Sequence, residues 1–434
     1  MLEALSDYKS QITSIKKPIT ELKEAYKKRV DDASDLRGTP LYHPYIGSGI
    51  GNGLLVELAD GSVKYDLIGG IGVHFFGHSF TDVISASIDG AMQNTVMQGN
   101  LQQNIQSFEL MELFKASSKL DHAFLTSSGA MACENGLKVI FQKKHPAFRV
   151  IAFDGCFMGR TIAMSQITDK PNFREGVPST LFVDYIPFFN PDDPKGSTEA
   201  TIKALKKHLV RHPKEYAALC LELVQGERGF YAGSKEFFSE IIQVAKEANL
   251  AILVDEVQTF ARTYELFGFQ YYGLQDLVDV VTIGKVAQCA ATMWKDEFNP
   301  RPGLLSQTFT SSSAAIFAAK FFIEYLLKAN LYGHNGKIAK LFHAFKERLM
   351  LLKGVVHGPF GIGSMIAFTP FEGDSKKVNE FVHRLYENGV ISFVAGSDPT
   401  RVRFLLPAAI MEVEDVAPIM RIVEKTLKEC ANSS

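Results

Sequence analysis

The chain has 434 residues, of which 46% are hydrophobic and 22% are charged, and its formal net charge is −2. This composition predicts a globular protein with one large core and a smaller second domain, and it lacks the basic excess typical of nucleic-acid-binding or membrane-surface proteins. The five cysteines have no CxxC or metal-ligand spacing, so we expect reduced thiols, no metal site and a cytoplasmic location. No apolar run has transmembrane length, and the N-terminus lacks the apolar segment of a signal peptide.

Hydrophobic spacing predicts the elements in chain order. Residues 1–35 have the near-helical spacing of an amphipathic helix, and a glycine-rich hairpin follows between Gly47 and Leu67. From about residue 75 to 310, strand and helix patterns alternate, which is typical of a parallel βαβ sheet. The strands predicted in this region are His122–Thr126, Arg149–Phe153, Ala217–Leu223, Ala251–Asp255 and Val278–Ile283.

The chain then leaves the predicted sheet. A long apolar helix is expected from about Ser313 to Ala329, and the remainder has the pattern of a small α+β domain. We therefore predict a large domain over residues 75–325 and a C-terminal small domain over residues 326–434. Residues 1–74 are expected to pack with the small domain, since both ends of the chain fall outside the large one.

Two of the predicted strands end on side chains that carry chemistry. Asp255 ends an apolar, β-branched strand, and Lys285 follows the next strand after a glycine. Ligands of parallel α/β sheets gather outside the carboxyl ends of the strands, so Asp255 and Lys285 could flank one small molecule. A lysine for a Schiff base and an acid for a ring nitrogen are what a pyridoxal phosphate enzyme requires. The pair therefore predicts a site for pyridoxal 5'-phosphate.

The segment Ser127–Met131 follows a strand and opens a predicted helix that runs to Lys144. Free backbone N–H groups and the helix dipole make such an N-terminus an anion site, to which Ser128 could add a hydroxyl and Gly129 a close backbone approach. The segment is thus a candidate phosphate site. The alternative is an ordinary helix cap.

Two other strand ends carry candidate side chains. Phe157 could stack on a planar cofactor ring, and Arg160 could grip a carboxylate through two parallel hydrogen bonds. Taken singly, these residues are equally consistent with a core phenylalanine and a surface arginine. Glu227, taken alone, is an ordinary loop carboxylate.

Together these motifs resemble those of the class III aminotransferases, pyridoxal phosphate enzymes of the aspartate aminotransferase fold, over nearly the whole chain. Asp255-Glu256-Val257-Gln258-Thr259 resembles the family's Asp-Glu-Val-Gln-Thr/Ser, and Gly284-Lys285 resembles its Gly-Lys. The segments near Thr168–Pro171 and Lys285–Cys289 are most similar to the lysine 6-aminotransferase and ornithine aminotransferase branch. The other motifs that follow the family's order are Phe157-Met158-Gly159-Arg160-Thr161, Glu222 to Glu227, Gln307-Thr308-Phe309 and Arg401-Val402-Arg403-Phe404.

The resemblance implies fold type I of the pyridoxal phosphate enzymes: a large domain with a mainly parallel seven-stranded sheet, and a small α+β domain built from both termini. It also implies a homodimer with the active site at the subunit interface. Lys285 would form the Schiff base and move a proton, and Asp255 would face the ring nitrogen. The other cofactor-binding residues that the resemblance implies are Ser128, Gly129, Ala130, Phe157, Val257, Gln258 and, from the other subunit, Thr308.

The reaction implied is the ping-pong transfer of an amino group, the terminal (ω) amine of an amino acid such as lysine, to 2-oxoglutarate. Arg160, Glu227, Gln258 and Arg403 are the implied substrate-binding residues. In the ω-amine branch of the family, a glutamate neutralises an arginine while the donor is bound and moves aside for the carboxylate of the acceptor. Glu227 and Arg403 occupy the matching positions, although a permanent salt bridge would look the same in the sequence.

Some positions depart from the family pattern. Met131 replaces the usual glutamate and Met158 the usual histidine, which affects the expected substrate and rate more than the cofactor. Two alternatives remain open: another reaction of the same cofactor, such as that of an aminomutase or racemase, and a non-catalytic dimer that keeps only the fold. The presence of Lys285, Asp255 and Gln258 together argues against the second, because a scaffold needs none of them.

Overall fold

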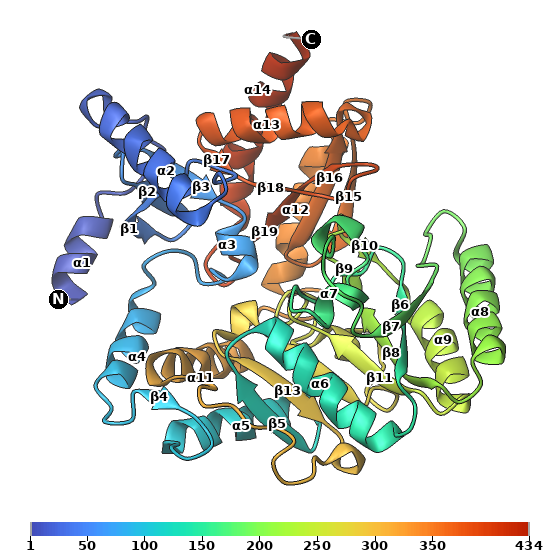
Figure 1. Cartoon of the computed structure of the whole chain (residues 1–434). Helices are drawn as coiled ribbons and strands as arrows, with labels where there is room; N and C mark the ends of the chain where they lie inside the picture. Colours follow the sequence, from blue (N-terminus) through green and yellow to red (C-terminus); the bar gives the residue numbers. More distant parts are fainter. Residues whose placement is uncertain (1, 433–434) are drawn as a thin grey trace. The chain divides into compact units, whose positions relative to one another are not determined.

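The computed structural model of the protein describes residues 2–432 (Figure 1). The chain divides into two compact units. Unit 1 joins both ends of the chain, Met1–Ser85 and Lys337–Ser434, and unit 2 is the continuous middle, Ala86–Gly336. The domain limits predicted from the sequence, after residues 74 and 325, lie slightly earlier in the chain at both points.

Unit 2 is built on a seven-stranded sheet with the spatial order β5-β13-β12-β11-β8-β6-β7. Strand β13 is antiparallel to both of its neighbours, and all other pairs are parallel. The fold class predicted from the sequence is confirmed. The strands are β5 (His122–Thr126), β6 (Arg149–Phe153), β7 (Phe182–Ile186), β8 (Tyr216–Glu222), β11 (Ala251–Asp255), β12 (Val280–Ile283) and β13 (Ala290–Trp294).

Helices cover this sheet because its central strands are apolar along their whole length. Every residue of β8, β11 and β12 is buried, as expected for parallel strands packed on both faces. Helix α6 (Gly129–Lys144) packs against β11, β12 and β13, and α9 (Lys235–Glu247) packs against β11 (Figure 1). Helix α9 presents the regularly spaced Phe237, Phe238, Ile241, Ile242 and Ala245 to the core.

The remaining elements of unit 2 are connections and short strand pairs. Strand β9 (Val224–Gln225) pairs with β10 (Tyr231–Ala232), and β4 (Met97–Gln98) pairs with β14 (Ser311–Ser312). Helix α4 (Thr81–Ala91) begins in unit 1 and ends in unit 2. The other helices are α5 (Ile105–Ser118), α7 (Met164–Ile167), η2 (Pro171–Phe173), α8 (Pro194–Arg211), α10 (Gly268–Tyr271), η3 (Lys285–Ala287), η4 (Asp296–Phe298) and α11 (Ser313–Lys328).

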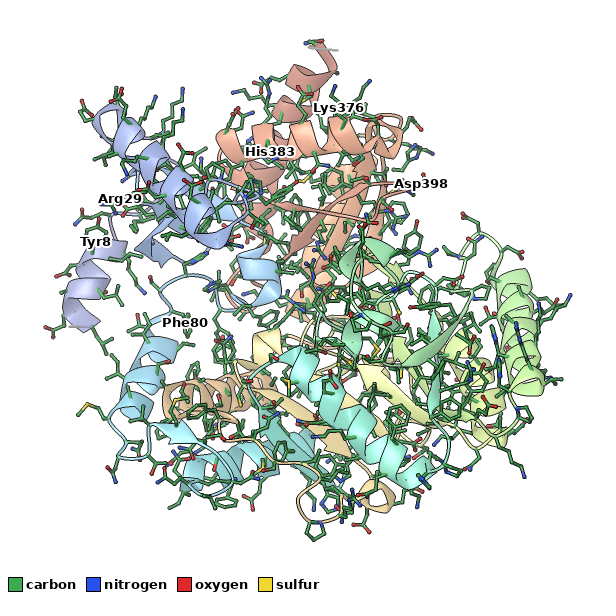
Figure 2. The ribbon with its side chains drawn as sticks, viewed as in Figure 1. Tyr8, Arg29, Phe80, Lys376, His383 and Asp398 are labelled. Carbon is green, nitrogen blue, oxygen red and sulfur yellow. The ribbon has the colours of Figure 1, made fainter. Side chains whose placement is uncertain are left out.

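Unit 1 contains two four-stranded sheets, ordered β1-β2-β3-β17 and β15-β16-β19-β18. Strand β17 runs parallel to β3 and so links the C-terminal part of the chain to the N-terminal part. His383, labelled in Figure 2, lies on α13 with its ring centroid 5.0 Å from that of Tyr42. The elements are α1 (Leu2–Lys9), η1 (Thr20–Leu22), α2 (Lys23–Arg37), β1 (Gly47–Asn52), β2 (Leu55–Leu58), β3 (Val63–Asp66), α3 (Gly69–Gly72), α12 (Lys337–Met350), β15 (Val356–Ile362), β16 (Met365–Pro370), η5 (Phe371–Gly373), α13 (Ser375–Glu387), β17 (Val390–Ile391), β18 (Phe393–Ala395), β19 (Arg401–Leu405), η6 (Val413–Asp415) and α14 (Val416–Asn432).

The single helix predicted over residues 1–35 is wrong. The chain forms α1 and α2 with a non-helical segment between them, in which Lys16 exchanges backbone hydrogen bonds with Val63. Ile12 is buried against Leu55 and Val63, so tertiary packing takes this segment away from the helix. Pro18 lies in the same segment and has no N–H to donate to a helical turn.

Three observations concern the whole described chain. None of the helices formed by residues 2–432 has the length and apolar character needed to cross a bilayer. The five cysteines are buried, and none of them is in a disulfide among the described residues. Over the same residues, no three His, Cys, Asp or Glu side chains gather in the way that a metal ion requires.

Candidate active site

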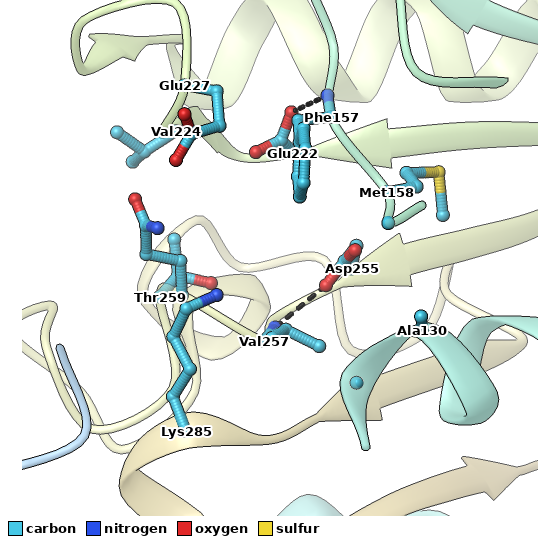
Figure 3. Close-up of a pocket in the computed structure, with 13 residues that line it drawn as sticks. Ala130, Phe157, Met158, Glu222, Val224, Glu227, Asp255, Val257, Thr259 and Lys285 are labelled. Carbon is cyan, nitrogen blue, oxygen red and sulfur yellow. Dashed lines mark hydrogen bonds between the residues drawn. The ribbon is translucent and has the colours of Figure 1, made fainter. Parts of the chain in front are cut away.

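A cavity of about 240 Å³ opens in unit 2 where the parallel strands of the large sheet end (Figure 3). The segments that follow β6, β8, β11 and β12 form it together with the N-terminus of α6. Parallel α/β sheets place their ligands at this edge. The lining residues are Gly129, Ala130, Phe157, Met158, Gly159, Glu222, Val224, Glu227, Asp255, Val257, Gln258, Thr259 and Lys285.

Asp255 is the last residue of β11, and its side chain is almost fully buried. Its Oδ1 accepts a hydrogen bond from the Val257 N–H at 2.8 Å, and its Oδ2 accepts one from Cys133 Sγ at 3.4 Å. Burial raises the pKa of Asp255, while the Val257 N–H and the charge of Lys285 act in the opposite direction. A carboxylate fixed in this way is suited to receive a cationic N–H donor.

Val257 lies between two glycines that bring backbone close to it. A Cβ on Gly129 would lie 2.7 Å from both methyl carbons of Val257, and a Cβ on Gly284 would lie 3.3 Å from one of them. The absence of these side chains therefore lets the start of α6 and the end of β12 pack directly against Val257. Gly129 and Val257 give the cavity an apolar floor beside the Asp255 carboxylate.

Phe157 lies across the cavity from Val257 (Figure 3), and Glu222 holds its backbone. Glu222 Oε2 accepts a hydrogen bond from the Phe157 N–H at 2.7 Å, and Oε1 accepts one from the Gly226 N–H at 3.2 Å. One carboxyl at the end of β8 thus fixes both the aromatic side chain and the turn that leads to Glu227. A flat ring between Phe157 and Val257 would have an aromatic and an aliphatic neighbour.

Lys285 follows Gly284 at the end of β12 and contributes its side chain to the cavity (Figure 3). Its backbone φ is +50°, in the left-handed region that residues other than glycine rarely adopt. Such conformations cluster at functional sites, where the surrounding structure maintains them. The turn at Lys285 takes the chain out of the strand and places an amine at the cavity wall.

Gln258 carries a buried polar atom that a ligand could satisfy. Within residues 2–432, its Oε1 is buried and has no hydrogen-bond partner. A Cβ on Gly226 would lie only 2.0 Å from this oxygen, so the missing side chain at that position makes room for the amide. Buried polar groups are almost always hydrogen-bonded, and an amide can serve as donor or acceptor. A bound molecule with a polar atom on this side would complete its bonding.

The first turn of α6 closes another wall of the cavity. Ser128 caps this 16-residue helix, and its Oγ accepts a hydrogen bond from the Met131 N–H at 3.3 Å. Ser128 is exposed and is not among the lining residues, whereas Gly129 and Ala130 are. The cap predicted as an alternative is therefore present, and the helix still directs its N-terminal dipole at the cavity.

Several buried carboxyl groups lie at the ends of β8 and β11. Burial, reinforced by the nearby Asp255, raises the pKa of Glu222 to about 8, and Asp255 and Glu222 are register partners on β11 and β8. Burial also raises the pKa of Glu256 to about 7, but this side chain accepts hydrogen bonds from Thr259 Oγ1 and from the backbone at the start of α10. Carboxyls with strongly shifted pKa values in a cavity are typical of a functional site.

Besides Ser128, three of the predicted site residues do not line this cavity. Arg160 is exposed, with its guanidinium carbon 3.7 Å from the ring centroid of Phe173. Thr308 is exposed at a second cavity, formed by residues 97–102 and 306–309. Arg403 is buried on β19 in unit 1. Glu227 does line the first cavity, and its pairing with Arg403 stays a prediction.

Sequence reasoning missed several contributors. Glu222 belongs to a recognised motif, but its bonds to Phe157 and Gly226 depend on loops distant in sequence. Cys133 has the spacing of an ordinary core residue of α6, and only the folded chain brings it to Asp255. Met158, noted as a departure from the family pattern, is buried and lines the cavity.

Comparison with known proteins identifies the family. The class III aminotransferase family matches residues 45–427. An acetylornithine aminotransferase of Archaeoglobus fulgidus is 28% identical over 372 residues, which cover 84% of this chain and 91% of that protein. A 5-aminovalerate aminotransferase of Pseudomonas aeruginosa is 27% identical over 404 residues, covering 87% and 92% of the two chains.

Solved structures agree on the fold. A lysine aminotransferase from M. tuberculosis superposes with a TM-score of 0.81 at 20% identity, covering 92% of this chain and 99% of that one. An ornithine aminotransferase from Toxoplasma gondii superposes with a TM-score of 0.80 at 21% identity, covering 96% of this chain and 100% of the other. Since the family match spans nearly the whole sequence, the chain belongs to the class III aminotransferases, a family of enzymes that depend on pyridoxal phosphate.

Proposed function

We propose that this aminotransferase moves the terminal amine of an amino acid such as lysine to 2-oxoglutarate, in a ping-pong reaction at the cavity of unit 2. The observation that carries the proposal is the convergence of Lys285, Asp255 and Gln258 on one cavity, between the side chains of Phe157 and Val257. Asp255 and Gln258 lie at or just after the end of β11 and Lys285 follows β12, so the sheet brings two separate segments to the same cavity.

The residues present fit the cofactor. When bound, pyridoxal phosphate supplies a reactive carbonyl carbon and an electron-withdrawing pyridinium ring. Asp255 would hold the ring N–H, and Phe157 and Val257 would contact the two ring faces. Gln258, which lines the cavity, would donate a hydrogen bond from its amide nitrogen to the ring oxygen. The N-terminus of α6, at Ser128, Gly129 and Ala130, would hold the phosphate, together with Thr308 of the partner subunit.

The protein side of the chemistry follows from the same geometry. Lys285 provides the amine among the lining residues, so its Nζ would hold the cofactor and would carry a proton to and from the substrate carbon that bears the amine. Asp255 would keep the ring nitrogen protonated, because a nearby carboxylate favours the cationic form. Glu222 orients Phe157 through its backbone N–H and so keeps the ring contact in place.

The choice of donor rests on the substrate-binding side chains. The relatives named after acetylornithine and 5-aminovalerate, and the structural neighbour named after lysine, act on molecules with an amine remote from a carboxylate. In this proposal Arg160, stacked on Phe173, binds that carboxylate. Glu227 neutralises Arg403 while the donor is bound and releases it for the carboxylate of 2-oxoglutarate.

The experiment is a donor panel run on three proteins: wild type, Lys285→Ala and Glu227→Ala. Lysine, ornithine, acetylornithine, 5-aminovalerate and 4-aminobutyrate are each offered with 2-oxoglutarate, and glutamate release is measured. Wild type should release glutamate with at least one ω-amino donor, and Lys285→Ala should release none and lose the visible absorbance of the bound cofactor. In single half-reactions, Glu227→Ala should impair the donor step and spare the 2-oxoglutarate step, because Arg403 keeps its charge.

Three results would count against these assignments. Failure of every donor to yield glutamate would contradict the ω-amine proposal. Loss or migration of the amine without any keto acid would indicate an aminomutase or racemase. If Glu227→Ala and wild type had equal rates in both half-reactions, Glu227 would not act as a switch, and any pairing with Arg403 would be a static salt bridge.

We also infer a homodimer in which the surface around the second cavity is the subunit interface. Three exposed apolar side chains line this cavity: Leu101 is fully exposed, Phe309 is 57% exposed and Met97 is 41% exposed. An apolar patch of this kind on a water-exposed surface is typical of a protein interface. The first cavity is also smaller than the roughly 300–1,000 Å³ of complete ligand sites, which is expected if the partner supplies the missing wall.

A further inference from the structure

Cys133 lies in α6 directly against the carboxyl of Asp255. Its side chain is fully buried, and its Sγ lies 3.4 Å from Asp255 Oδ2 and 3.4 Å from Thr282 Oγ1. Thr282 is on β12 and is the register partner of Asp255. Three elements of unit 2 therefore meet at one carboxyl: the helix at the cavity wall and two adjacent strands.

The direction of these hydrogen bonds follows from the chemistry of the groups. An ionised carboxylate can only accept, so the thiol proton of Cys133 must point to Asp255. The Thr282 hydroxyl is then the donor toward the sulfur. Burial raises the pKa of the Cys133 thiol well above its usual value, so the thiol stays protonated and remains a donor.

Asp255 has a second register partner besides Thr282. Glu222 on β8 is the other register partner of Asp255 and is itself a buried acid. Burial disfavours the charge of Asp255, whereas the Val257 N–H, the charge of Lys285, the Cys133 S–H and the Thr282 hydroxyl favour it. The Cys133 and Val257 donors also act on different oxygens, Oδ2 and Oδ1, and so fix the plane of the carboxyl.

We propose that Cys133 is a positioning residue for the transamination reaction, whose S–H···Oδ2 hydrogen bond keeps the Asp255 carboxylate oriented toward the ring nitrogen of the cofactor. This inference rests on the proposed role of Asp255. Cys133 acts through Asp255 and touches neither substrate nor cofactor. Thr282 completes the arrangement, with its Oγ1 3.4 Å from the sulfur.

Cys220 provides a matched control. It is a fully buried cysteine on β8 and belongs to the same apolar cluster as Cys133. Among the described hydrogen bonds, no Cys220 bond reaches Asp255, so Cys220→Ala removes the same volume from the same core without touching the carboxylate. Cys133→Ser keeps a donor at the critical position, and Cys133→Ala removes it.

The experiment measures the dissociation constant of pyridoxal phosphate for the full-length apoprotein, by absorbance titration, and the pH at which the spectrum of the bound cofactor changes. Cys133→Ala should weaken binding about tenfold and shift the spectral titration, since a bond to a charged group is lost. Cys133→Ser and Cys220→Ala should stay within about threefold of wild type. Thr282→Val, which keeps the shape of the side chain, should change binding in the same direction as Cys133→Ala.

Asp255→Asn separates this proposal from the one on which it rests. If Asp255→Asn weakens binding strongly but Cys133→Ala does not, the role of Asp255 stands and that of Cys133 is refuted. If Asp255→Asn leaves binding unchanged, both assignments fail. If Cys133→Ala and Cys220→Ala weaken pyridoxal phosphate binding equally, Cys133 contributes only to core packing. The same conclusion follows if Cys133→Ser binds the cofactor as weakly as Cys133→Ala. If Cys133→Ala does not fold, Cys133→Val, which fills the space without a donor, is compared with Cys133→Ser and Cys220→Ala and decides in the same way.

Discussion

At the scale of single residues, Glu222 is subject to opposing effects on its pKa. Two backbone N–H donors, from Phe157 and Gly226, favour its ionised form. Burial and the nearby Asp255 favour the neutral form and prevail, so that the pKa of Glu222 rises to about 8. At neutral pH the pair formed by Glu222 and Asp255 therefore carries less charge than two free acids.

This shift predicts a pH dependence of stability. The unfolded chain ionises Glu222 near pH 4.5 and the folded chain only near pH 8, so rising pH between these values favours unfolding. Glu222→Gln does not titrate, and its own packing cost is independent of pH. The melting temperature of Glu222→Gln apoprotein, relative to wild type, should therefore rise by roughly a few degrees from pH 5 to pH 8.

The exposed Glu240 on α9 serves as the control, because Glu240→Gln should follow wild type at every pH. Thermal unfolding by circular dichroism at several pH values is sufficient. A difference between Glu222→Gln and wild type that stays constant with pH would contradict a raised pKa at Glu222.

At the scale of elements, the start of α6 contributes both the helix cap and part of the cavity wall. Ser128 uses its hydroxyl to cap the helix, while the next two residues, Gly129 and Ala130, line the cavity. Gly129 also packs against Val257, which follows β11, so the N-terminus of the helix lies close to the apolar floor of the cavity. The helix can approach this closely only because position 129 has no side chain.

Gly129→Ala tests this close approach. The backbone at Gly129 does not have a positive φ, so alanine is conformationally allowed there, but its Cβ would lie 2.7 Å from two carbons of Val257. Overpacking of this kind costs about 1–3 kcal/mol. Because Val257 lines the cavity, its displacement should raise the dissociation constant of pyridoxal phosphate about tenfold, as measured by absorbance titration.

Gly47→Ala in β1 is the matched control, because a Cβ there meets no atom closer than 3.7 Å. It should leave both binding and stability near wild type. Wild-type affinity in Gly129→Ala would show that Val257 can move aside at no cost, and that the contact is not needed for the site.

At the scale of the whole molecule, function is expected to need two chains. Thr308, implied by the family resemblance as a phosphate ligand, lies at the second cavity and not at the first. Its neighbours in that cavity include the exposed Leu101 and Phe309. A partner chain seated on this surface would cover the apolar patch and supply a residue that each chain lacks at its own site.

Leu101→Asp should therefore separate the subunits. A charge placed in an apolar interface loses its hydration without gaining a partner, so we expect the mass in light scattering to fall from dimer to monomer, with loss of activity. Val210→Asp, at a position on α8 that is 81% exposed, introduces the same charge elsewhere and should remain dimeric and active. A monomeric wild type, or a dimer unaffected by Leu101→Asp, would contradict the proposed interface.

The sequence by itself determined the features that depend on local pattern. Apolar, β-branched runs located five strands of the large sheet, including β5, β6 and β11 with their observed bounds. It did not reveal β7 (Phe182–Ile186), whose residues are largely half-buried or exposed, or β13 (Ala290–Trp294), which is antiparallel and breaks the βαβ alternation. The spacing of Asp255 and Lys285 was enough to predict the cofactor, because parallel strands all end at one edge of the sheet.

Only the tertiary structure decided which side chains act together at that edge. The bonds from Glu222 to Phe157 and from Cys133 to Asp255 join residues that are far apart in the chain, and no periodicity encodes them. In the same way, packing of Ile12 against the β2–β3 hairpin overrode the helical spacing of the N-terminal segment. Local pattern fixes an element because it acts through neighbours in sequence, whereas the orientation and charge of a buried group depend on neighbours in space.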